Sequence, residues 1–366
     1  ALDPGTADFT KYVAVGNSLT SGLTDGALFK LAQENSFPNI LASKFALVGG
    51  GAFTQPLTND NIGGLLLGGN VIQPPRLYFD GKGPVVLPAT PTTEVSAIKA
   101  GPYNNMGVPG ALSFHFLAKG YGNIAGLQTG QANPYYVRMA SSPTASILED
   151  AMAQNPTFFT LWAGFNDVLG YAVTGGDGSI KITDQPTFNF AITTLVSTLT
   201  SKGAKGLVVN ITDVTKAAHF RTVPYNALNP ATNPAFAAQV PTLNATFAQL
   251  NQAFAFLGVP ERSVVYSATA PSPVLIHDES LANITPQLTQ VLIGGGLPPQ
   301  TAALLGSQFG QSRQAKSTDL FVLPSSSVIG TLNNAYFQQL VSLGVSQAQA
   351  GQLAVNGITY PLQDKW

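Results

Sequence analysis

The sequence predicts a three-layer α/β/α sandwich, in which helices cover both faces of a parallel sheet of about five strands, with a later helical insertion. Three observations predict this fold: short apolar runs recur up to about residue 215, helical patterns separate them, and glycine or proline bounds them. Alternating strand and helix patterns favour βαβ units, and parallel strands covered on both faces form continuous apolar runs. We expect residues 1–366 to form a single domain.

Three apolar runs are the predicted strands of this sheet. Tyr12–Val15 is the first, Phe158–Trp162 is the second, and Leu207–Ile211 is the most clearly buried of the three. Each is short and apolar, as expected for a buried strand rather than a helix. Helical spacing predicts helices over Ala27–Gln33, Ile40–Phe45, Ile147–Ala153 and Pro186–Thr200.

Two segments depart from this alternation. Residues 49–100 are rich in glycine, proline and threonine and are expected to form a long loop excursion. Residues 270–366 are expected to be a helical insertion, in which Leu288–Ser307 and Phe337–Val355 form two helical hairpins separated by a strand at Asp319–Leu323. The hairpins either cover an active site or pack against an edge of the sheet.

Composition excludes several classes of function. The net charge is −1, only 10% of residues are charged, and no stripe of lysine and arginine runs along the chain, so nucleic acid is not an expected partner. The absence of cysteine excludes disulfides, thiolate metal sites and a cysteine nucleophile. No metal-binding motif or nucleotide-binding glycine frame occurs, so we expect neither a metal nor a cofactor.

The chain also has the composition of an exported protein, being rich in Asn, Gln, Ser and Thr but poor in charge. No apolar run approaches the roughly 20 residues of a membrane span. The sequence begins at Ala1, as a mature protein would after removal of a leader. Attachment to a membrane surface would therefore need a lipid anchor outside this sequence.

The strand at Tyr12–Val15 runs into the turn Gly16-Asn17-Ser18-Leu19. A strand–turn–helix places a serine hydroxyl at the carboxyl edge of a parallel sheet, beside the free N–H groups of a helix N-terminus. Two further polar turns follow downstream. Gly107 can offer a backbone N–H and Asn166 a side-chain amide to an oxyanion, which is what attack by a serine on a carbonyl requires. Each of these residues taken alone is better explained as an ordinary turn residue.

Together the three turns resemble the sequence blocks of the SGNH (GDSL-type) hydrolase family. Gly16-Asn17-Ser18-Leu19 matches the first block, Gly107 the glycine of the second, and Gly164-Phe165-Asn166-Asp167 the third. The resemblance implies a flavodoxin-like SGNH hydrolase fold, with Ser18 as nucleophile and Gly107 and Asn166 in the oxyanion hole. Asn17 stands where the family usually has aspartate.

A softer resemblance links the chain to a bacterial surface-lipoprotein branch of the same family. It rests on Gln33–Pro38, Gly50–Leu57 and Asp213–Thr215. It implies a location at the outer membrane or outside the cell, and an outer-membrane protein as partner.

The fourth block of the family, an Asp-x-x-His that supplies the base, has no match. The histidines are His115, His219 and His277, and none has an aspartate three residues earlier. We expect the missing block to follow Trp366. His219 can lie near the active edge of the sheet but is more simply a loop histidine, His277 has only an adjacent acid, and His115 is expected to be structural.

The expected function is that of a carboxylic ester hydrolase of the acylhydrolase, lipase or esterase type, acting on an ester of unknown class. The chain as written lacks a recognisable catalytic histidine. The alternative is a surface-exposed binding or accessory subunit that keeps the hydrolase fold without turning over substrate.

Overall fold

The computed structural model describes residues 3–363 and 366, and the chain divides into two compact units. The sheet unit comprises the residues up to Gly170 together with Ile182–Thr212. The helical unit comprises Tyr171–Lys181 and the residues from Asp213 onward. This division differs from the single domain expected from the sequence.

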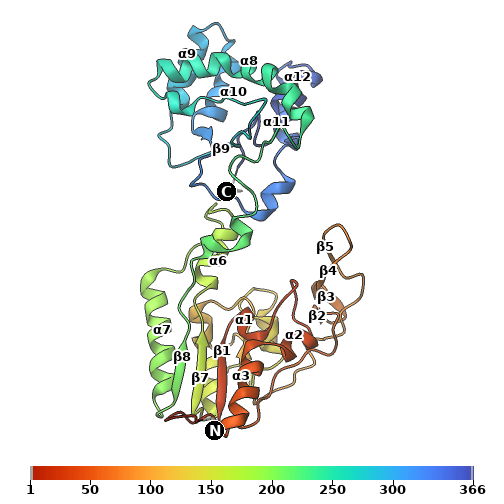
Figure 1. Ribbon diagram of the computed structural model, residues 1–366, viewed down its shortest axis with the longest axis vertical. Coiled ribbons are helices and arrows are strands. Elements are labelled where there is room, and N and C mark those ends of the chain that lie inside the picture. The colour runs from red at the N-terminus through yellow and green to blue at the C-terminus, as the bar shows by residue number, and fades with distance from the viewer. Residues whose placement is uncertain (1–2, 364–365) are drawn as a thin grey trace. The chain divides into compact units, whose positions relative to one another are not determined.

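The sheet unit is built on four parallel strands in the order β6–β1–β7–β8, of which β1, β7 and β8 are seen side by side in Figure 1. Their bounds are Tyr12–Gly16 for β1, Asn105–Gly107 for β6, Phe158–Trp162 for β7 and Lys205–Val208 for β8. The predicted parallel sheet is confirmed, with four strands where about five were expected.

Helices pack on both faces of this sheet, because successive side chains of β1 point to opposite sides. Val13 and Val15 belong to a core shared with α5 (Ile147–Ala153) and α7 (Gln185–Thr200). Tyr12 and Ala14 instead belong to a second cluster, with residues of α3 (Phe37–Phe45). Helices were predicted in all three of these segments.

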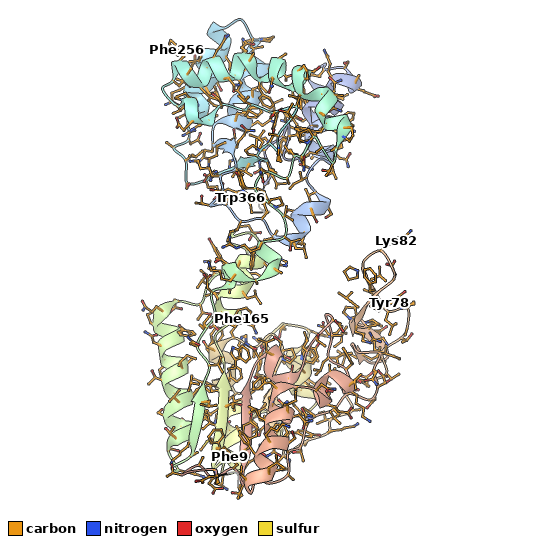
Figure 2. All side chains as sticks on the ribbon, in the orientation of Figure 1. Phe9, Tyr78, Lys82, Phe165, Phe256 and Trp366 are labelled. Carbon is orange, nitrogen blue, oxygen red and sulfur yellow. The ribbon has the colours of Figure 1, made fainter. Side chains whose placement is uncertain are left out.

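The rest of the sheet unit consists of short helices and loops. The helices are α1 (Ser18–Ser21), α2 (Lys30–Glu34), α4 (Pro134–Val137) and the start of α6 (Asn166–Val173). The excursion at 49–100 is largely irregular, as expected, but contains the hairpins β2–β3 (Leu65–Leu67 and Asn70–Gln73) and β4–β5 (Leu77–Phe79 and Pro84–Val86). Tyr78 and Lys82 mark the second hairpin in Figure 2.

One strand prediction is wrong in its burial. The run Leu207–Ile211 was predicted as the clearest buried strand, yet β8 ends at Val208, is the last strand of the sheet, and has four exposed residues. Leu207 is 56% and Val208 52% exposed. Since these neighbours point to opposite faces, both faces of β8 are largely exposed, and no described strand pairs with its outer edge.

The helical unit contains the two predicted hairpins. The first is α9 (Thr285–Gly294) with α10 (Pro299–Phe309), and the second is α11 (Asn334–Ser342) with α12 (Gln347–Leu353). The long helix α8 (Pro234–Phe256) packs with them, and β9 (Leu275–His277) pairs antiparallel with β10 (Ser312–Gln314). The strand expected at Asp319–Leu323 is wrong, since only Phe321 forms a bridge, to Val223.

No helix in the described ranges is both long enough and apolar enough to cross a membrane.

Candidate functional site

The predicted site residues lie at the same edge of the sheet. Gly16, the last residue of β1, is in register with Gly107 of β6 on one side and with Trp162 of β7 on the other. Two backbone hydrogen bonds continue beyond the strands, from the Val108 N–H to the Gly16 carbonyl at 2.8 Å and from the Asn17 N–H to the Trp162 carbonyl at 3.3 Å. Three adjacent strand ends therefore carry the three turns.

The strand order predicts a ligand-binding crevice at this edge of the sheet. The chain passes from β1 to β6 on one side and then returns to β7 on the other side of β1. Connections that leave a strand in opposite directions open a crevice at the carboxyl ends of a parallel sheet, where ligands bind in α/β proteins. Figure 2 labels Phe9 near the amino end of this sheet and Phe165 at the carboxyl end.

Ser18 is the first residue of α1 and is half-buried. Its carbonyl accepts hydrogen bonds from the Leu23 N–H at 3.0 Å and from the Ser21 hydroxyl at 2.7 Å, which fixes the backbone of the turn. Within the described part of the chain, neither the hydroxyl nor the backbone N–H of Ser18 has a hydrogen-bond partner. Both groups are therefore free to meet a substrate.

Near this turn, several buried side-chain atoms have no hydrogen-bond partner among the described residues. They are Asn17 Nδ2, Thr20 Oγ1 and Trp162 Nε1. Asn17 is fully buried, and its Oδ1 accepts a long hydrogen bond of 3.4 Å from the Leu19 N–H. Native proteins leave few such atoms unsatisfied, and those that remain commonly mark bound water or functional positions.

The role expected for Gly107 does not fit its hydrogen bonding. Its backbone N–H is buried and donates to Asn105 Oδ1 at 3.0 Å, so in this structure it is not free to hold an oxyanion. A Cβ at Gly107 would lie 2.3 Å from the Ser21 nitrogen. Glycine is therefore needed here because α1 crosses very close to β6, which is a structural reason.

Gly110, three residues later, has the property expected of Gly107. It is exposed, its φ is +78°, and its backbone N–H has no partner among the described residues. Gly110 is not among the site residues predicted from the sequence. The signal that could have found it is the second glycine of Gly107-Val108-Pro109-Gly110, because it lies beyond the strand end rather than in the strand.

Asn166 and Asp167, at the start of α6, hold the loop that carries Gly110. The Asn166 side-chain amide donates to the Ala111 carbonyl at 3.0 Å. The buried Asp167 carboxylate accepts from the backbone N–H of Ser113 at 2.9 Å and from its hydroxyl at 2.7 Å. The third predicted turn is thus tied directly to the second. The second amide hydrogen of Asn166 has no protein acceptor within the described residues.

His115 lies in the 3₁₀ helix η2 (Ser113–Leu117), after the same loop, but its hydrogen bonding is wrong for a base. Its Nδ1 accepts a hydrogen bond from the Leu112 N–H at 3.1 Å, so in the neutral ring the proton is on Nε2. A triad histidine needs the opposite tautomer, with a free lone pair on Nε2. Burial lowers the pKa of His115, against the opposing effect of the Asp167 charge.

The packing of the His115 ring indicates a structural role. The ring stacks on Tyr121 with centroids 4.4 Å apart and meets Phe114 edge-on at 4.5 Å.

The other two histidines belong to the helical unit. His219 lies in the 3₁₀ helix η5 (Ala218–Phe220), where its ring meets Phe220 edge-on at 4.9 Å and its Nε2 is buried without a partner. His277 ends β9. The adjacent Asp278 does not serve it, because that carboxylate binds Arg313 at 2.6 Å and Ser280 at 2.6 Å.

Among residues 3–363 and 366, no group of three or more histidine, aspartate or glutamate side chains is placed to hold a metal ion.

No family model matches this chain, and neither does any curated protein or solved structure. Function must therefore be inferred from the geometry of this edge of the sheet.

Proposed function

We propose that the sheet unit is a serine-dependent carboxylic ester hydrolase of the SGNH type, with Ser18 as its nucleophile. One observation carries this proposal: the free hydroxyl and free N–H of Ser18 lie on the same sheet edge as the free N–H of Gly110 and the amide of Asn166. Attack on an ester needs this pairing of one hydroxyl with several N–H donors. The order of strands around β1 supports the flavodoxin-like fold of that family.

In the proposed reaction the Ser18 oxygen attacks the ester carbonyl carbon, and the hydroxyl proton passes to a base. The carbonyl oxygen becomes an oxyanion that accepts hydrogen bonds from the N–H groups of Ser18 and Gly110 and from the Asn166 amide. The tetrahedral intermediate then collapses, and the alcohol leaves with a proton returned by the base. Water releases the acid from the acyl-enzyme by the same steps.

His115 does not suit the role of the base. His115 is the only histidine of that unit, and its Nδ1 is held by the Leu112 N–H in the tautomer that a triad does not use. A general base has to reach the proton that it abstracts. We therefore propose that the group which accepts the Ser18 proton is not His115.

The competing function is a binding or accessory protein that retains this fold without catalysis. The tautomer of His115 is the observation that favours it, because the sheet unit alone then has no histidine base. In that case the free donors at Ser18, Gly110 and Asn166 would hold a carbonyl or an anion without turnover. Catalysis remains our first proposal, because these donors are combined with a hydroxyl oxygen that can attack the carbonyl carbon.

The test compares hydrolysis of p-nitrophenyl acyl esters by the wild-type protein, Ser18→Ala, and the control Ser201→Ala, which alters an exposed serine of the same unit. The hydrolase proposal predicts that Ser18→Ala loses at least about 10³-fold in kcat, while Ser201→Ala does not. His115→Asn should keep wild-type activity. Equal rates for wild type and Ser18→Ala would leave only the binding function.

A further inference from the structure

The helical unit contains an apolar cavity between its two hairpins and α8. Its volume is about 230 Å³, and its walls come from α8, α9, α10, α11 and α12. Most of the lining is hydrophobic and includes Phe247, Leu250, Leu292, Leu305, Leu340 and Leu353. The sequence predicts the two hairpins but indicates no ligand for them.

The size of this cavity fits a small organic molecule. An engineered apolar cavity of about 150 Å³ binds benzene, which has six non-hydrogen atoms. By simple proportion, a cavity of about 230 Å³ holds roughly nine non-hydrogen atoms. Well-packed cores contain few voids larger than a water molecule, so a partly open apolar cavity of this size differs from ordinary core packing.

One lining residue supplies a polar contact for such a molecule. Gln308 of α10 donates through its Nε2 to the Thr359 carbonyl at 3.0 Å, and this bond fixes which end of the amide is nitrogen. The other end, Gln308 Oε1, is buried and has no hydrogen-bond partner. The cavity therefore combines apolar walls with one unsatisfied acceptor, which is the composition of a small-molecule site.

We propose that this cavity binds the chain of a medium-length aliphatic molecule whose head group donates a hydrogen bond to Gln308 Oε1, such as an alcohol. Apolar walls remove the alkyl chain from water, and the head group satisfies an acceptor that the protein leaves unpaired. The free amide oxygen of Gln308 can only accept, so a ketone or another molecule without a donor gains nothing from it. The proposal does not depend on Ser18, since it concerns binding within the helical unit.

The first experiment is calorimetric titration of the full-length chain with 1-octanol and with 2-octanone. Both probes have nine non-hydrogen atoms, but only the alcohol can donate a hydrogen bond. We expect one molecule of 1-octanol to bind saturably, about tenfold more tightly than 2-octanone. The two affinities should differ by the contribution of one hydrogen bond to a buried acceptor. Absence of saturable binding, or equal affinity for the two probes, overturns the proposal.

Variants then locate the binding site. Gln308→Met keeps a side chain of similar length but removes the acceptor, so the preference for 1-octanol over 2-octanone should disappear. Val345→Phe and Leu305→Trp enlarge half-buried lining residues on different elements and should weaken binding of both probes at least about tenfold. Leu343→Phe, at an exposed residue near Val345 that does not line the cavity, is the matched control and should bind normally.

Two variants that fill the cavity, Val345→Phe and Leu305→Trp, are used because either one can fail to fold. Far-ultraviolet circular dichroism identifies which of them keep the native helix content. Unchanged binding in a folded filling variant overturns the assignment to this cavity. Ester hydrolysis is not a readout here, so the outcome is independent of the proposed reaction at Ser18.

Discussion

The side-chain amide of Asn166 donates a hydrogen bond to the Ala111 carbonyl at 3.0 Å, and this bond holds the loop after β6 against the start of α6. Ala111 directly follows Gly110, whose N–H is free. Asn166 therefore has two roles in the proposed reaction: one amide hydrogen positions the neighbouring donor, and the other can itself reach an oxyanion. An asparagine suits both roles because its amide carries two hydrogens.

Asn166→Ala tests this double role. We expect the rate of acyl transfer to Ser18 to fall about 10²- to 10³-fold, as when one oxyanion donor is removed from a serine hydrolase. The loss should appear in kcat more than in KM, because the donors act mainly on the charge that develops during attack. Asn70→Ala, at an exposed asparagine of the β2–β3 hairpin, serves as control. A normal kcat in Asn166→Ala would remove Asn166 from the mechanism.

The buried pair Asp167–Ser113 predicts a measurable loss of stability. Asp167→Ala leaves the N–H and the hydroxyl of Ser113 without their acceptor, and we expect the free energy of unfolding to fall by about 3 kcal/mol. Urea unfolding of the sheet unit can be followed by Trp162 fluorescence in a Trp366→Phe background. Ser113→Ala removes only the hydroxyl and should cost about 1 kcal/mol. Equal stability of Asp167→Ala and the background protein would contradict the pairing.

The helical unit is expected to lose stability in acid through Asp278. Burial opposes ionisation of this carboxyl, but hydrogen bonds from Ser280 and the Arg313 guanidinium outweigh it and hold the pKa of Asp278 below its ordinary value. Because the folded-state pKa is depressed, the stabilisation is complete above the unfolded pKa of about 3.9 and is lost as the pH falls through the lower folded value.

Trp366 can report this transition, because its ring lies 5.4 Å from the Arg313 guanidinium carbon. In a Trp162→Phe background, we expect the thermal midpoint of the helical unit to drop on going from about pH 5 to about pH 3. The drop should be smaller in Asp278→Asn, which has no charge to lose. The same acid sensitivity in both proteins would show that Asp278 is not responsible.

The exposed edge strand β8 predicts self-association. Leu207 and Val208 are uncovered, and no described strand pairs with the outer edge of β8. Exposed apolar edge strands are templates for pairing between chains, and a lysine on the edge suppresses it. Val208→Lys should therefore raise the concentration at which light scattering first detects aggregates. Thr193→Lys, an equal charge change on an exposed position of α7, should leave it unchanged.

Two strands of the sheet and the order of the site turns were predictable from sequence because local patterns specify them. Tyr12–Val15 and Phe158–Trp162 are confirmed as strands, and Ile147–Ala153 as a helix, since each is bounded by turn or cap residues. Burial of β8 was not predictable in this way. Its apolar residues have the pattern of a covered strand, but the position at the edge of the sheet depends on tertiary pairing.

Two further features escaped the sequence analysis for identifiable reasons. Helix α8 contains Pro241, which favours a helix break, although Phe236, Val240, Leu243, Phe247 and Leu250 repeat at helical spacing and are all buried. Whether Gly107 or Gly110 offers a free N–H to an oxyanion depends on the Asn105 side chain, which accepts a hydrogen bond from the Gly107 N–H. The hydrogen bond from the Gly107 N–H to the Asn105 side chain cannot be recognised from the spacing of glycines in the sequence.

Whether Ser18 is an activatable nucleophile is measured most directly by its reaction with a fluorophosphonate, followed by intact mass and peptide mapping. We expect one adduct per chain, located on Ser18 and absent from Ser18→Ala, with labelling slowed in Asn166→Ala. A wild-type protein that stays unlabelled, or that is labelled to the same extent as Ser18→Ala, would contradict it.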